Sequence, residues 1–311
     1  MTRRLRASWL IDGTGAPPIE DALVVWDEGG RIIYAGRAGE APQLTGTTDG
    51  SGESGESAET IEATGCTVLP GLIDTHVHLT FAAAAGAGCP PRSAGPAVTA
   101  AQVALICGDS DSERIVRALA AAQAALAVGV TTMCDCGDKG SSVLSLRELV
   151  EAGVVAGPRI LSSGPPITTR AGHCWWLGGE ADTLDEAVTR VRELVKLGAD
   201  FVKVMATGGN LTKGSNPLEP QYPVETLAAI VADSHRLGRR VVAHAHGVEG
   251  IARAVVAGVD AVEHCSWQRR DGHAVDEALA ARMAAAGTVV GDTLAGFGAV
   301  LLREGVAPHD V

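Results

Sequence analysis

The pattern of hydrophobic and polar residues changes near residue 65. Before that point, short β-prone runs at 5–11, 22–26, 31–34 and 60–63 are separated by turn residues. Residues 45–60 consist mostly of Gly, Ser, Thr and Glu, and so little apolar surface predicts an exposed loop. The pattern therefore predicts a small β-domain over residues 1–65.

From residue 66 to 311 the pattern alternates between strand and helix. Apolar residues recur at helical spacing in the runs 113–128, 143–152, 184–197, 224–237, 248–256 and 275–285. A glycine follows each run, at Gly129, Gly153, Gly198, Gly238, Gly258 and Gly287, and glycine readily takes the left-handed conformation that ends a helix. Strand candidates lie near residues 68, 130, 159, 201, 241, 259 and 288. Strands alternating with helices predict a parallel sheet, and this many units predict a (β/α) barrel.

The number of strand candidates is one short of the eight that close such a barrel. We therefore expect an α/β fold, a (β/α)8 TIM-type barrel lacking strand eight, incomplete at its C-terminus. The edges of the first and seventh strands would be open, and apolar residues that the missing segment should cover would be exposed. We expect such a chain to aggregate or self-associate, and the intact protein to be a homo-oligomer.

Composition and charge narrow the class of protein. Hydrophobic residues make up 46% of the chain, which suits a well-buried core, and the net charge is -12 with a pI near 5.2. This acidity argues against nucleic acid or an anionic membrane as partner. The seven cysteines have no framework spacing, so we expect thiols in a reducing cytoplasm, with Cys134 and Cys136 as buried structural residues.

Candidate chemistry begins with His76 and His78. They lie two residues apart at the end of an apolar run, so a strand would place both on one face, where they could bind one metal ion. Two incidental histidines on a half-buried strand would give the same pattern. Later apolar runs favour the metal site, because metal-competent side chains recur in them, namely Lys203, His244 with His246, and His264.

The order His-x-His, Lys, His, His on successive strands resembles the amidohydrolase superfamily, in its imidazolonepropionase and Xaa-Pro dipeptidase branch. The resemblance implies that residues 1–65 form part of a small β-sandwich beside the barrel. It also implies a pair of divalent ions, which we expect to be two Zn²⁺, although manganese, iron, nickel or cobalt would also suit the site. The implied metal ligands are His76, His78, Lys203, His244 and His264.

The same resemblance assigns roles to three further positions. It implies that Lys203 reacts with carbon dioxide, and that the resulting carbamate bridges both ions. His246 matches a substrate-contacting position, although a supporting hydrogen-bond role fits it nearly as well. His173, in the loop after the third strand, matches a histidine that binds a substrate carboxylate or the developing oxyanion, and a structural role fits it equally. His235 and His273 are expected to be solvated.

The expected activity follows from these assignments. We expect a metal-dependent amidohydrolase that cleaves a carbon–nitrogen bond in a dipeptide, an N-acyl amino acid or a cyclic amide through a metal-bound hydroxide. The aspartate of strand eight has no counterpart in the sequence, since Asp292 and Asp310 stand in the wrong context. An inactive fragment of such an enzyme is therefore one alternative. Lactone or phosphoester hydrolysis at the same site is another.

Overall fold

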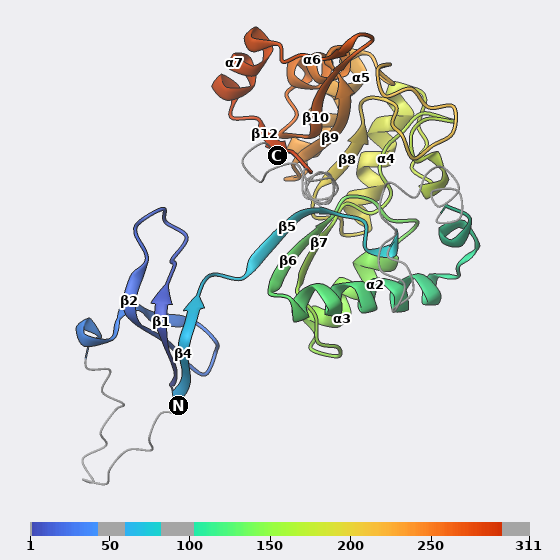
Figure 1. Cartoon of the computed structure of the whole chain (residues 1–311). Coiled ribbons are helices and arrows are strands. Elements are labelled where there is room, and N and C mark those ends of the chain that lie inside the picture. Colours follow the sequence, from blue (N-terminus) through green and yellow to red (C-terminus); the bar gives the residue numbers. More distant parts are fainter. Residues whose placement is uncertain (1, 43–59, 82–102, 294–311) are drawn as a thin grey trace. The chain divides into compact units, whose positions relative to one another are not determined.

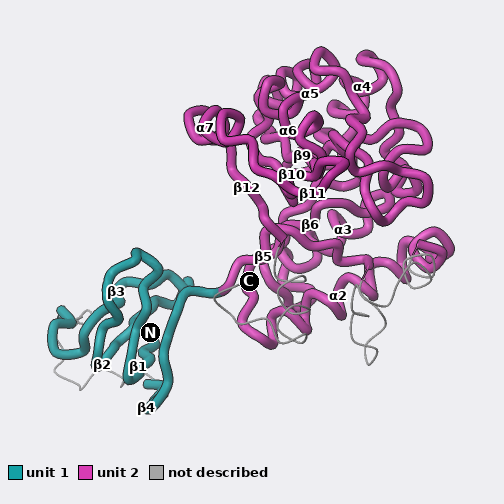
Figure 2. The backbone as a smooth tube through the Cα atoms, turned by 45° about the horizontal axis from the view of Figure 1, so that its top comes forward, with its two compact units in different colours: residues 1–71 teal, residues 72–311 magenta. Residues whose placement is uncertain are grey.

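The computed structural model describes residues 2–42, 60–81 and 103–293. The chain forms two compact units, Met1–Gly71 and Leu72–Val311 (Figure 2). The loop predicted at 45–60 lies outside the described residues except for Thr60, and Cys89 lies outside them as well. None of the described helices is long and apolar enough to cross a bilayer.

The first unit is built on one four-stranded sheet in the order β3-β2-β1-β4. Its strands are β1 (Arg3–Leu10), β2 (Ile19–Trp26), β3 (Ile32–Arg37) and β4 (Thr60–Val68). The β4 strand runs five residues beyond its predicted end at 63, because it pairs in parallel with β1 up to Val68. The barrel strand predicted to begin near residue 68 therefore starts later, as β5 (Leu72–Val77) of the second unit. The described residues of the unit form a single sheet, so the second layer of a sandwich stays a prediction.

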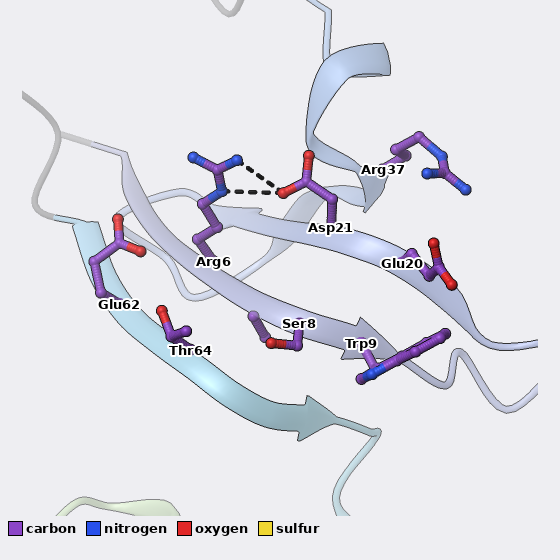
Figure 3. Close-up of a pocket in the computed structure, with 9 residues that line it drawn as sticks. Arg6, Ser8, Trp9, Glu20, Asp21, Arg37, Glu62 and Thr64 are labelled. Carbon is purple, nitrogen blue, oxygen red and sulfur yellow. Dashed lines mark hydrogen bonds and ion pairs between the residues drawn. The ribbon is translucent and has the colours of Figure 1, made fainter.

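The two faces of this sheet differ in character. Leu10, Ala22 and Val24 form its small apolar core. The face in Figure 3 is polar, and there the Arg6 guanidinium donates to Asp21 Oδ1 through Nε at 3.2 Å and Nη2 at 2.8 Å. Both side chains are about half exposed, and ion pairs of this kind contribute little to stability.

The second unit carries the parallel strands of the predicted barrel (Figure 1). In chain order these strands are β5 (Leu72–Val77), β6 (Val130–Asp135), β7 (Arg159–Ser162), β8 (Val202–Met205), β9 (Val241–Gly247), β10 (Ala261–Arg269) and β12 (Val289–Gly291). They form two ladders, β5-β6-β7 and β8-β9-β10-β12, and a parallel bridge from Ile167 to Val204 joins the two. The seven predicted strands are therefore present. No ladder between described residues pairs β12 with β5, and the missing eighth strand stays a prediction.

Helices alternate with these strands as the pattern predicts. They are α2 (Asp111–Ala127), α3 (Ser142–Glu151), α4 (Leu184–Lys196), α5 (Val224–Arg236), α6 (Val248–Ala257) and α7 (Glu277–Ala286). All six glycines predicted to end helices have positive φ, and Gly258 at +85° and Gly287 at +70° are the C-caps of α6 and α7. At these φ values glycine avoids the steric cost of a Cβ atom. A short hairpin strand, β11 (Gly272–His273), was not predicted.

The core of the second unit fixes which strand side chains face away from the helices. Val202 and Val204 on β8 pack into the same buried cluster as Ile230 of α5 and Ile251 of α6. Successive side chains of a strand point to opposite faces. Lys203, between the two valines, therefore points to the inner side of the strands.

Candidate metal centre

His76 and His78 lie at the carboxyl end of β5, as predicted. His76 is its fifth residue and His78 follows its last residue, and their ring centroids are 5.4 Å apart. His78 Nδ1 is 3.0 Å from the carbonyl oxygen of Gly137. Because a carbonyl only accepts hydrogen bonds, this contact places the proton on Nδ1 and the lone pair of the neutral ring on Nε2. Nε2 is then the nitrogen of His78 that suits a metal ion.

Lys203 is buried to 1% exposure on β8. Its Nζ has no hydrogen-bond partner among the described atoms. A buried ammonium without a partner is costly. A lysine in this position therefore points to something further that engages the nitrogen, such as a bound ion or a chemical modification.

Three histidines from β9 and β10 complete the cluster. The ligand nitrogens of His244, His246 and His264 lie within 4.8 Å of one another, and each pair of rings has centroids 4.7 Å apart. His264 has φ of +67°, an unfavourable conformation for a non-glycine residue, which the surrounding structure must hold in place. Such local strain is frequent where side chains are aimed into a functional site.

Hydrogen bonds hold one nitrogen of each of these rings. His244 Nε2 lies 3.0 Å from the carbonyl oxygen of Gly208, so its lone pair is on Nδ1. His246 Nδ1 contacts Ser266 Oγ at 2.7 Å, and His264 Nδ1 contacts Thr293 Oγ1 at 2.9 Å. Supporting contacts of this kind are typical of histidines that bind metal ions.

The two histidine groups belong to one cluster. His76 and His264 have ring centroids 4.8 Å apart. Burial lowers the pKa of His264 below its usual range, and the charge of Lys203 is the next largest cause. Burial also lowers the pKa of His244, with smaller contributions from His173, His264, His246 and Lys203. The structure thus brings the five predicted ligand residues together, and burial favours the neutral, metal-binding form of His244 and His264.

His173 joins the same cluster from the loop between β7 and the short helix at Trp175–Leu177. Its ring centroid is 4.5 Å from that of His244, and burial, followed by the charge of His246, lowers its pKa to about 3. Its Nδ1 is buried without a hydrogen-bond partner among the described atoms. A Cβ atom on Gly209 would lie 2.5 Å from the ring, so this glycine makes room for His173.

Glu263 and Cys136 also face the cluster, and the sequence analysis assigned neither to the site. Glu263 Oε2 is 2.6 Å from His76 Nδ1, and ligand atoms of His76, Cys136 and Glu263 lie within 4.8 Å of one another. Burial raises the pKa of Glu263, opposed by the charge of Lys203. Burial also raises the pKa of the Cys136 thiol to about 12, which keeps it protonated. The sequence offered one signal for Glu263, namely a carboxylate directly before His264 in an otherwise apolar run.

Other predicted positions lie outside the cluster. His235 is 45% exposed and bonds to Asp260 Oδ2 at 2.8 Å, and His273 is exposed on β11, which confirms both as surface residues. Asp292 directly follows β12, at the end of the seventh parallel strand. Asp310 lies outside the described residues.

The donor set fits divalent metal ions. Imidazole nitrogen is a common ligand of zinc, and neutral rings with lone pairs directed by hydrogen bonds are the form that binds metal. The unpartnered Nζ of Lys203 adds a buried group that an ion or an anionic modification would satisfy.

Comparisons with known proteins agree with this arrangement. The sequence model of the Amidohydrolase family matches residues 67–305. Ochratoxinase from Aspergillus niger is 27% identical over an alignment of 297 residues, which covers 84% of this chain and 54% of that protein. Imidazolonepropionase from Mesorhizobium japonicum is 28% identical over 306 residues, covering 92% of this chain and 68% of that protein. This chain thus spans about half the length of the ochratoxinase that it matches.

Solved structures with a similar fold are also known. A Xaa-Pro dipeptidase with methionine bound in its active site matches with a TM-score of 0.75 and 26% identity. The match covers 100% of this chain and 71% of the dipeptidase.

Proposed function

The chain belongs to the amidohydrolase family, and from that premise we propose that it is a metal-dependent hydrolase of carbon–nitrogen amide bonds. Its substrate class is a dipeptide, an N-acyl amino acid or a cyclic amide. The names of its relatives support an amide substrate, since they include an imidazolonepropionase and a Xaa-Pro dipeptidase.

The metal ions would be held by His76, His78, His244 and His264, together with modified Lys203. Bound divalent ions would polarise the scissile carbonyl and make a water molecule acidic enough to attack it at neutral pH. The surrounding residues keep the His244 and His264 imidazoles neutral and fix the orientation of their rings. Burial and hydrogen bonds from the other ring nitrogen carry out these two tasks.

Lys203 carries a carbamate in the active protein. The neutral Nζ adds to the carbon of carbon dioxide, one C–O π bond breaks to give an oxyanion, and the displaced N–H proton passes to solvent. The product would replace an unpartnered buried nitrogen with an anionic oxygen ligand of the kind that divalent cations prefer. The burial of Nζ among histidines, without a hydrogen-bond acceptor, is the observation that carries this proposal.

His173 and His246 act on the substrate. Because its pKa is about 3, His173 is neutral at physiological pH and can donate a hydrogen bond to a carboxylate or to a developing oxyanion from one ring nitrogen. His246 is held through Nδ1 by Ser266. Its ligand nitrogen also lies within 4.8 Å of those of His244 and His264, so it contacts either the substrate or an ion.

A substrate panel tests this function. Dipeptides, N-acyl amino acids, cyclic amides, lactones and phosphoesters are incubated with chain that has been stripped of metal and with chain reconstituted with zinc and bicarbonate. We expect amide hydrolysis that requires metal and falls by about 100-fold or more in His264→Asn. The matched control is His235→Asn, a surface histidine, which should retain activity. Hydrolysis of lactones or phosphoesters alone would contradict the amide assignment, and equal rates without metal would contradict the mechanism.

A further inference from the structure

Glu263 occupies an unusual place for a carboxylate. It lies on β10, where it is register partner of His244 on β9 and of Gly291 on β12. Register partners on adjacent parallel strands share a face of the sheet, so Glu263 is on the same inner face as His244. Its exposure is 5%. A buried carboxylate is retained only where partners stabilise it.

The direct partner of Glu263 is His76, which lies on β5, the first parallel strand of the second unit. Oε2 lies 2.6 Å from Nδ1, and the side chains are 6% and 9% exposed. An ionised carboxylate only accepts hydrogen bonds. With Glu263 ionised, this contact requires a proton on Nδ1 of His76, which leaves the lone pair of the neutral ring on Nε2.

Gly291 provides the space that Glu263 needs. A Cβ atom at residue 291 would lie 2.2 Å from Oε2 and 2.7 Å from Cδ of Glu263. Gly291 is absent from the residues with positive φ, so its backbone conformation does not require glycine. An alanine at residue 291 would therefore have to displace the Glu263 carboxylate from its present position, and glycine leaves that position open.

We infer that Glu263 is a positioning residue, which fixes the tautomer and ring orientation of His76 so that Nε2 is presented to the metal ion. This inference rests on the proposed function, because it assumes that His76 binds metal. It concerns a residue that acts through His76 and does not itself contact the ion. Carboxylate partners of metal-binding histidines typically change metal affinity by about 10- to 100-fold when they are removed.

The tautomer of His76 in the metal-free protein gives a test that does not depend on activity. The chain is labelled with ¹⁵N-histidine, His76 is assigned with His76→Asn, and ring nitrogen shifts are compared in wild type and Glu263→Ala. In wild type we expect Nδ1 protonated and Nε2 unprotonated. In Glu263→Ala we expect a mixture of tautomers or the reverse. An unchanged tautomer, or an unprotonated Nδ1 in wild type, would overturn the inference.

Metal affinity supplies the second measurement, by zinc competition with a chromophoric chelator. We expect the zinc Kd to rise about 10-fold in Glu263→Gln and up to about 100-fold in Glu263→Ala. The matched control is Asp260→Asn, which alters the His235–Asp260 pair at the surface and should leave the Kd within twofold. Complete loss of one ion with an unchanged His76 tautomer would show that Glu263 is a metal ligand, which would also overturn the inference.

Gly291→Ala provides an independent perturbation if the Glu263 variants fail to fold. It displaces the carboxylate without deleting it, and we expect the same tautomer change and a weaker Kd. If the protein binds no metal and hydrolyses no substrate, the proposed function is wrong. The tautomer measurement is made on metal-free protein, so it still shows whether Glu263 orients His76. Wild-type values for both readouts in folded Gly291→Ala would count against the inference.

Discussion

Asp135 offers a quantitative test of the environment behind the metal centre. It is the last residue of β6 and is fully buried. Its Oδ1 accepts from the backbone N–H of Leu79 at 3.0 Å, and its Oδ2 accepts from Ser162 Oγ at 3.1 Å. Burial, together with the nearby charge of Asp138, raises the pKa of Asp135 from 3.8 to about 7.

The raised pKa implies that stability falls as the pH rises. Below about pH 4 the carboxyl is protonated in both the folded and the unfolded chain, so it carries no penalty. Between about pH 4 and 7 the unfolded chain loses the proton while folded Asp135 keeps it, which favours unfolding. A shift of about three units corresponds to about 4 kcal/mol, and this loss is complete above pH 7.

Asp135→Asn removes this titration and keeps the hydrogen bonds. The asparagine carbonyl can accept from Leu79, and its NH₂ can donate to Ser162 Oγ, which presently accepts from Gly164 N–H at 3.2 Å. We expect the free energy of unfolding of the variant, relative to wild type, to increase between pH 4.5 and 7.5 by about 3 kcal/mol, because part of the penalty is already present at pH 4.5. Urea unfolding followed by far-UV circular dichroism at a series of pH values measures it.

The matched control for this experiment is Asp233→Asn. Hydrogen bonds from Arg192 chiefly lower the pKa of Asp233, so its contribution to stability is present above the ordinary aspartate pKa and is lost only as the pH falls below it. The difference between this variant and wild type should therefore stay level between pH 4.5 and 7.5. A level difference for Asp135→Asn as well would refute the reasoning about its burial.

Three further predictions follow from the site. Lys203→Met should weaken zinc binding and remove the carbamate signal seen by ¹³C NMR in ¹³C-bicarbonate. It should also raise the stability of the metal-free chain, because it removes a buried amine. A carbamate signal of wild-type intensity in this variant would contradict the prediction. Gly209→Ala should lower kcat/KM by displacing His173, whose ring lies 2.5 Å from the added Cβ, and unchanged kinetics would argue against a role for His173. Iodoacetamide at pH 8 should modify exposed Cys66 well before Cys136, whose pKa is about 12, as peptide mass spectrometry would show; equal rates would contradict burial of Cys136.

The elements of this fold were predictable because their signals are local. Helical periodicity ended by glycine is contained within about fifteen residues, and Gly258 and Gly287 end α6 and α7 as expected. The first barrel strand was placed too early, near residue 68. The pairing that draws Val68 into β4 is with Leu10, a partner far away in the sequence.

The histidines and Lys203 were predictable as candidates because each ends or interrupts an apolar run. Glu263 was missed for a different physical reason. Its partner His76 is 187 residues away, and the room for its side chain comes from Gly291 on a third strand. Neither of these long-range contacts can be inferred from a single sequence, so the sequence shows Glu263 only as one polar residue within a strand.

The central claim is that His76, His78, Lys203, His244 and His264 hold divalent metal ions. Anomalous diffraction at the zinc edge, from crystals of the chain reconstituted with zinc and bicarbonate, tests it most directly. We expect anomalous peaks among these five side chains, with density for a carbamate on Lys203. This expectation would be contradicted by zinc bound only elsewhere, or by no peak among these residues in protein that retains zinc after dialysis.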